Sequence, residues 1–118
     1  MQHLRARADF ERVRREGRTW AHRLLVLAAR PNELNVTRVG VSVGKQTGCA
    51  VARNRAKRLM REAARAHYPN IAPGWDLVLI ARAAIVTVKM QDVATALQTL
   101  LRQAGLDKQP VASETMGG

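Results

Sequence analysis

Cysteine, long apolar runs and aromatic side chains are all scarce in this sequence. Cys49 is the only cysteine, so neither an intrachain disulfide nor a zinc site built from several cysteines is possible. No apolar run approaches the roughly 20 residues that span a bilayer, and the first ten residues, MQHLRARADF, lack the apolar core of a secretory signal. These absences predict a soluble, cytoplasmic protein. Aromatic residues make up 3% of the chain, which is low for a protein that stacks many bases.

Acidic residues are also few. The 118 residues include 9 Asp and Glu against 20 Lys and Arg, a formal net charge of +11. Self-repulsion at this charge opposes folding, so the excess indicates an anionic partner, nucleic acid in the first place and an anionic membrane in the second. The hydrophobic content of 47% is ordinary and excludes a disordered basic tail.

Hydrophobic periodicity and chain breakers predict a single domain at residues 1–105. The expected order is helix, two strands, helix, strand and helix, at residues 5–16, 20–30, 37–45, 49–67, 73–82 and 89–104. The first two strands are expected to pair as an antiparallel hairpin. Residues 106–118 are polar and small and are expected to form a disordered tail. This order predicts an α+β fold, a small α/β sandwich with the helices packed on one sheet.

The expected helix at residues 49–67 separates alanine from arginine. One side collects Leu59, Met60, Ala52, Ala56, Ala63 and Ala66, and the other Arg53, Asn54, Lys57, Arg58, Arg61 and Arg65. Like charges four residues apart destabilise a helix, so this face favours polyanion binding over an ordinary solvated face. A membrane-surface helix would need large apolar residues in place of the alanines.

Asn54 stands out as a neutral residue on the basic face. Its amide offers both a donor and an acceptor to a sugar, a base edge or a metal-bound water. The alternative is that Asn54 lies close to the helix start and helps to cap it.

Three stretches together resemble the protein subunit of bacterial ribonuclease P. The longest is RVGVSVGKQTGCAVARNRAKRLMREAAR, which joins a valine-rich strand to a Gly-containing turn and an Arg-Asn-Arg helix. DFERVRREGR is similar to the first helix of the family, and GWDLVLIAR to a later strand. The resemblance extends from about Leu4 to Ala104.

This resemblance implies a two-layer α/β sandwich with a small mixed sheet and a left-handed β-α-β crossover, an arrangement shared with a ribosomal protein domain. It implies the protein component of a ribonucleoprotein endonuclease that removes the 5′ leader from precursor tRNA. The RNA subunit would hydrolyse the phosphodiester with Mg²⁺, so no catalytic or metal-ligating residue is expected in the protein. The expected partners are the catalytic RNA and the leader, with no membrane and no obligate protein partner.

The resemblance also assigns two sets of residues. The surface facing the catalytic RNA would comprise Lys45, Arg53, Asn54, Arg55, Lys57, Arg58, Arg61 and Arg65. A cleft for the single-stranded leader would comprise Phe10, Arg14, Leu25 and Ala28. Aromatics common in relatives are missing at the last three of these positions, with Trp20 as a nearby substitute, and Gln46 replaces a frequent lysine.

Two other classes of protein share some of these features. A ribosomal-type protein that packs on structural RNA without turnover would have the same charge and fold. A double-stranded DNA regulator would need a helix and a short turn before the basic helix, where the sequence instead predicts the valine-rich strand.

Overall fold

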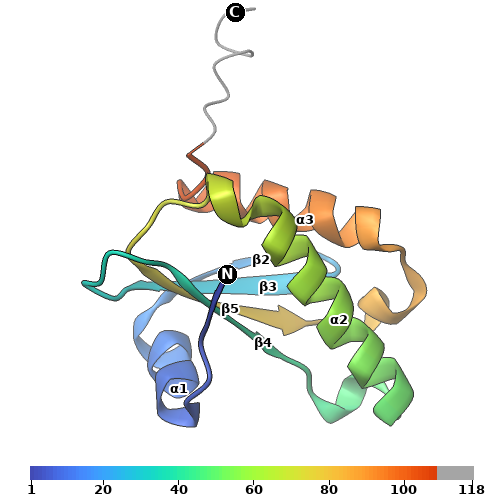
Figure 1. The fold of residues 1–118 in the computed structure, drawn as a ribbon. Helices are drawn as coiled ribbons and strands as arrows, with labels where there is room; N and C mark the ends of the chain where they lie inside the picture. Colours follow the sequence, from blue (N-terminus) through green and yellow to red (C-terminus); the bar gives the residue numbers. More distant parts are fainter. Residues whose placement is uncertain (109–118) are drawn as a thin grey trace, which may run out of the picture.

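Five strands form one mixed sheet in the computed structural model, which describes residues 1–108. The sheet order is β1-β4-β5-β3-β2 (Figure 1). Strands β1 and β4 are parallel, as are β4 and β5, whereas β3 is antiparallel to both β5 and β2. The strands are β1 (Gln2–His3), β2 (Arg18–Ala21), β3 (Leu25–Pro31), β4 (Arg38–Ser42) and β5 (Trp75–Ala81).

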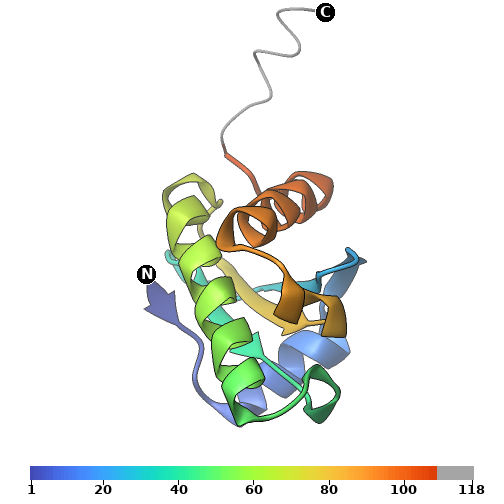
Figure 2. The same cartoon turned by 90° about the vertical axis from the view of Figure 1, so that its right-hand side faces the viewer.

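Two helices cover one face of the sheet and one helix lies against the other (Figure 1). Helices α2 (Ala50–His67) and α3 (Met90–Ala104) lie side by side and form the second layer of the sandwich (Figure 2). Helix α1 (Arg7–Glu16) packs on the opposite face, against β3 and β5. Short 3₁₀ turns are η1 (Lys45–Thr47), η2 (Tyr68–Asn70) and η3 (Ala83–Thr87). The α+β class expected from the sequence is confirmed. The first expected helix, α1, packs on the face of the sheet opposite to α2 and α3.

The central strands bury side chains on both faces, which explains their continuous apolar runs. On β3, Leu25 and Leu27 face the core under α2 and α3, whereas Ala28 faces α1. The side chains of β5 alternate in the same way, because Leu77 faces α2 and α3 and Val78 faces α1. The sheet therefore separates a large core from a small one.

Small side chains bring α2 close to the sheet. Its buried residues are Ala56, Leu59, Met60, Ala63 and Ala64. The expected apolar side was therefore right in its centre and wrong at its ends, because Ala52 is only half-buried and Ala66 is exposed. One face of α2 is fixed against the core, so its opposite face has a fixed orientation.

The expected hairpin between residues 20–30 and 37–45 is wrong. Strand β5 lies between β3 and β4, and α2 connects the parallel strands β4 and β5 as a crossover. The segment 20–30 is itself divided, because a turn at His22 separates β2 from β3. In this turn the N–H of His22 donates to the Leu25 carbonyl at 2.9 Å, and the N–H of Leu24 donates to His22 Nδ1 at 3.0 Å.

The chain remains ordered for three residues beyond the expected domain end. Gly105 ends α3 in the left-handed conformation, with φ 75°, as expected for its position. Leu106 is buried, Asp107 bridges to Ile71, and the N–H of Lys108 donates to the Asn70 carbonyl at 2.6 Å. The expected disordered tail is therefore wrong for residues 106–108, and residues 109–118 lie outside the described part.

A buried carboxylate ties the sheet to α1. Asp76 is 4% exposed and receives two hydrogen bonds from the neighbouring Arg38 side chain, at 2.8 and 2.6 Å. The Asn32 amide donates to the same carboxylate at 2.9 Å, and Arg38 also lies 3.8 Å from Asp9 on α1. Desolvation alone would raise the pKa of Asp76, but the hydrogen bonds from Arg38 and Asn32 outweigh it and lower the pKa.

Candidate RNA interface

A stripe of four cationic side chains runs along the outer face of α2. Arg53, Lys57, Arg61 and Arg65 recur every fourth residue and therefore lie one above another on the helix surface. Arg61 and Arg65 are exposed, and Arg53 and Lys57 are half-buried. Arg58 lies beside the stripe, 4.0 Å from Glu62. We call Arg53, Lys57, Arg61 and Arg65 the basic stripe.

Arg55 is directed inward and contacts the segment before α3. Its guanidinium donates to the Val86 carbonyl at 3.0 Å and to the Val88 carbonyl at 2.7 Å. These two bonds tie α2 to the end of η3. Because backbone carbonyls engage this part of its donor fork, we expect Arg55 to stabilise the fold, and its contact with RNA stays a prediction.

The position of Asn54 excludes a capping role. Helix α2 begins at Ala50 with Cys49 as its N-cap, so Asn54 lies in the second turn. Its side chain is exposed. Among the described residues, 1–108, no side-chain hydrogen bond caps α2. The amide of Asn54 is available to an external partner next to the basic stripe.

The start of α2 extends the positive surface. Lys45 is exposed in η1, and Gly48 makes the turn into the helix at φ 128°, a conformation that glycine adopts readily. The N–H groups of Ala52 and Val51 lower the pKa of the exposed Cys49 thiol. The same N–H groups favour phosphate at this end of the helix.

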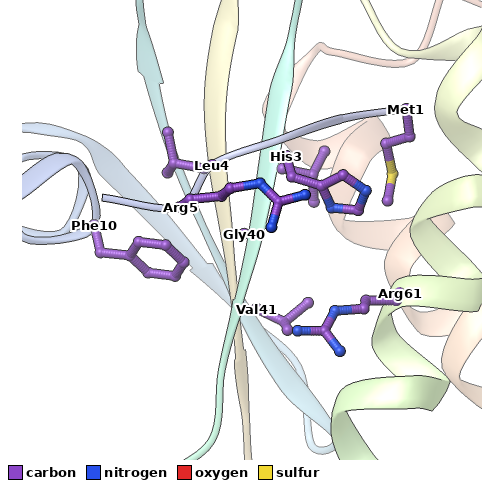
Figure 3. A pocket seen from close by; sticks show the side chains of 9 residues that line it. Met1, His3, Leu4, Arg5, Phe10, Gly40, Val41 and Arg61 are labelled. Carbon is purple, nitrogen blue, oxygen red and sulfur yellow. The ribbon is translucent and has the colours of Figure 1, made fainter. Parts of the chain in front are cut away.

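A cavity of about 250 Å³ opens at the edge of β4, beyond the end of its neighbour β1 (Figure 3). Strand β1 pairs only with Arg38 and Val39, so the edge of β4 is unpaired from Gly40 onward. Phe10 of α1 borders the cavity on one side and Arg61 of α2 on the other (Figure 3). The lining residues are Met1, His3, Leu4, Arg5, Phe10, Val39, Gly40, Val41 and Arg61.

Phe10 reaches the cavity because residue 40 has no side chain. A Cβ on Gly40 would lie 2.3 Å from Phe10 Cζ, closer than nonbonded carbons approach. The ring therefore lies directly against the backbone of β4. Phe10 is half-exposed and lines the cavity, where a base could stack on its ring.

We expect Gly40→Ala to destabilise the protein by about 1–3 kcal/mol, because the added methyl group must displace the Phe10 ring. Urea unfolding measures this change. Phe10→Leu in the Gly40→Ala background provides the control, since a smaller side chain makes room for the methyl group and should recover part of the loss. Equal losses with and without Phe10→Leu would show that the ring is not the obstacle.

The other expected cleft residues do not meet at this cavity. Leu25 is 0% exposed and faces the core under α2 and α3. Ala28 is also 0% exposed and lies in the small core beneath α1. Arg14 is exposed on α1 but does not line the cavity. Leu25 and Ala28 are therefore corrected from ligand contacts to core residues.

Trp20 does not replace the missing cleft aromatics. It packs against the large core and, with Trp75, lines a separate cavity of about 290 Å³ on the α3 side of the sheet. The Arg18 guanidinium lies 5.5 Å from the centre of the Trp20 ring. Trp75 and Tyr68 also pack against this core.

Sequence reasoning missed seven of the nine residues that line the cavity, among them His3, Arg5 and Gly40. His3 lies in a polar N-terminal segment in which no strand is expected, and Arg5 is the first residue of the expected helix at 5–16. Gly40 lies on the polar side of the expected strand at 37–45. The parallel pairing of β1 with β4 places His3 and Arg5 beside Arg61. No local signal reveals this pairing, because a two-residue strand has no measurable periodicity.

Two other features, a metal-binding cluster and a membrane-spanning helix, are absent from the described part of the chain. No group of three or more His, Cys, Asp and Glu side chains that could hold a metal ion occurs within residues 1–108. Over the same residues, no helix combines the length and the apolar character needed to cross a membrane.

A basic stripe that leads along α2 to an open cavity is typical of an α+β protein that binds a polyanion. The family model for ribonuclease P matches residues 1–105, and the chain belongs to the ribonuclease P protein family. It is 45% identical over 119 residues to the ribonuclease P protein component of Herpetosiphon aurantiacus, covering 99% of this chain and 97% of that protein. The corresponding protein of Roseiflexus castenholzii is 46% identical over 113 residues, covering 95% and 92%.

Solved structures of family members share this fold. The ribonuclease P protein of Staphylococcus aureus superposes with a TM-score of 0.81 at 30% identity, covering 91% of this chain and 98% of that one. The protein of Thermotoga maritima gives a TM-score of 0.78 at 31% identity, covering 87% and 97%. The mixed sheet with three helices is therefore the family fold.

Proposed function

We propose that this chain assists a catalytic RNA in removing the 5′ leader from precursor tRNA, by binding that RNA through the basic stripe and the leader through the cavity. As a ribonuclease P protein it is a component of a tRNA-processing ribonuclease. The observation that supports two adjoining binding surfaces is that Arg61 belongs to the basic stripe and also lines the cavity. RNA bound along α2 would therefore meet a leader at the edge of β4.

Hydrolysis is assigned to the RNA subunit, with Mg²⁺ held mainly by RNA. Within residues 1–108 no group of three or more His, Cys, Asp and Glu side chains could hold an ion, which supports a site whose ligands come mainly from RNA. What the protein supplies is positive charge that offsets phosphate repulsion, and the Asn54 amide, which can accept a hydrogen bond from a metal-bound water. We place this activity in the cytoplasm and propose no obligate protein partner.

Reconstitution with the cognate catalytic RNA tests the function. At limiting Mg²⁺, adding the protein is expected to accelerate cleavage of precursor tRNA, and to raise affinity more for a precursor than for tRNA without a leader. A protein that binds the RNA but stimulates no cleavage would be a ribosomal-type packing protein, and the proposal would be lost.

The regulator of double-stranded DNA is disfavoured by the structure. The elements before α2 are β4 and η1, so no helix-turn-helix unit precedes the basic helix in the described chain. Binding to random duplex DNA as tight as to the catalytic RNA, at physiological salt, would restore that alternative.

We expect Arg61→Ala and Asn54→Ala to affect RNA binding in different ways. Arg61→Ala should reduce the magnitude of the slope of log K against log salt concentration by about one, because one phosphate contact is lost. Asn54→Ala should leave this slope unchanged and slow cleavage at limiting Mg²⁺. Filter binding over a salt series and single-turnover cleavage measure the two effects. Lys108→Ala, an equal charge change outside the stripe, serves as the control and should alter neither.

A further inference from the structure

His3 lies among positive charges at the mouth of the cavity. In the parallel pairing, His3 is opposite Val39, whose side chain belongs to the core on the α2 side. Register partners point to the same face of a sheet, so the imidazole points toward α2. Figure 3 shows the ring beside the Arg5 side chain, with Arg61 reaching from α2.

The surroundings of His3 favour its neutral form in the free protein. Partial burial lowers its pKa from 6.5, and the charges of Arg5, the amino group at Met1, Arg61 and Arg65 lower it further. The neighbouring charges that lower this pKa are thus all positive. Phosphate groups placed among them would offset that repulsion and favour the imidazolium.

The other two histidines have structural partners. His22 Nδ1 accepts a hydrogen bond from the N–H of Leu24 at 3.0 Å, inside the turn between β2 and β3. His67 Nε2 lies 2.8 Å from the Ala94 carbonyl and joins α2 to α3. Neither lines the cavity. His3 is thus the histidine whose protonation can respond to a ligand there.

We propose that His3 takes up a proton when single-stranded RNA enters the cavity, so that the leader is bound by a third cation beside Arg5 and Arg61. The proposal rests on the proposed function, because it requires the leader to occupy this cavity. It goes beyond that function by making leader binding, rather than binding of the catalytic RNA, dependent on pH.

The direction of the pH dependence follows from linkage. RNA raises the pKa of His3 above its value in the free protein, so the additional affinity is fully present below the free-protein pKa. It is lost as the pH rises through the pKa in the complex. One proton is exchanged, so the affinity for leader falls at most about tenfold per pH unit within this window.

Nuclear magnetic resonance of the histidine Cε1 protons tests the proposal directly. The full chain is titrated from about pH 5 to pH 8, alone and with a single-stranded RNA of roughly six nucleotides, which is within the usual site size of such grooves. His3→Gln assigns the His3 signal and removes the titrating group. We expect RNA to raise the pKa of His3. The signals of His22 and His67, which do not line the cavity, provide the internal controls.

A second measurement uses the reconstituted complex with catalytic RNA. The ratio of affinities for precursor tRNA and for tRNA without a leader should fall from about pH 6 to pH 8, and His3→Gln should flatten this dependence. RNA that binds the cavity and shifts neighbouring signals, yet leaves the pKa of His3 unchanged, would overturn the proton uptake and leave the proposed function intact. A complex that does not discriminate the leader at any pH would overturn both.

Discussion

Replacing Asp76 by alanine is expected to lower the free energy of unfolding by about 2–4 kcal/mol, because it removes the acceptor of three hydrogen bonds and leaves Arg38 without its main partner. The Arg38 side chain is 29% exposed and can be partly rehydrated, which keeps the loss below that of a fully buried ion pair. Urea unfolding followed by the fluorescence of the adjacent Trp75 measures the change.

Asp9 provides the matched control for this prediction. Its carboxylate lies 3.8 Å from the same Arg38 side chain but is more exposed, so Asp9→Asn should cost less than about 1 kcal/mol. Equal losses from Asp76→Ala and Asp9→Asn would show that the buried carboxylate has no special role.

The same carboxylate makes stability depend on pH. The pKa of Asp76 in the folded protein is below its ordinary value of 3.8, so its contribution is present above that value and lost as the pH falls through the lowered pKa. Asp76→Asn should therefore lose less stability than the unmodified protein between about pH 4 and pH 2. Parallel losses in the two proteins would assign acid unfolding to other groups.

Replacing Arg55 by alanine is expected to destabilise the protein by about 2–4 kcal/mol while leaving the salt dependence of RNA binding unchanged. The reason is that its guanidinium donates to the carbonyls of Val86 and Val88, which would lose a charged donor. Arg55→Lys should recover only part of the loss, since one ammonium group does not reproduce the planar fork. Thermal unfolding and a salt series of RNA binding measure the two properties.

Arg58 is the matched control on the same helix. Its side chain is 65% exposed and lies 4.0 Å from Glu62, so Arg58→Ala should change stability by less than about 0.5 kcal/mol. An Arg55→Ala protein that keeps its unfolding midpoint but shows a reduced salt slope would make Arg55 a phosphate ligand after all.

Local sequence patterns predicted the helices well and the sheet poorly. The three helices begin within two residues of their expected starts and end at the expected residues, because helical periodicity and the glycines that follow two of them, Gly17 and Gly105, are local signals. The hairpin of residues 20–30 and 37–45 was wrong because strand order depends on distant segments. Placing β5 between β3 and β4 buries both faces of its apolar run, and this advantage is invisible when each strand is considered alone.

For the candidate site too, local patterns predicted some residues correctly, whereas contacts between distant segments decided the others. Helical periodicity predicted the outward direction of Arg53, Lys57, Arg61 and Arg65, because one helix determines which of its residues share a face. The same periodicity could not show that Arg55, at the boundary of that face, meets the carbonyls of a segment about 30 residues away. Likewise, the resemblance placed Leu25 and Ala28 together in one cleft, whereas β3 directs them to opposite faces of the sheet, and both faces are covered.

The sequence by itself determined the class of partner and the basic face of α2, since net charge and helical spacing are properties of the chain alone. Only the tertiary structure decided where a ligand can enter. The cavity exists because β1 ends after two residues, Gly40 leaves room for Phe10, and the α2 crossover brings Arg61 to the edge of β4. Each of these contacts joins segments that are far apart in the sequence, and packing on both faces of the sheet holds those segments in place.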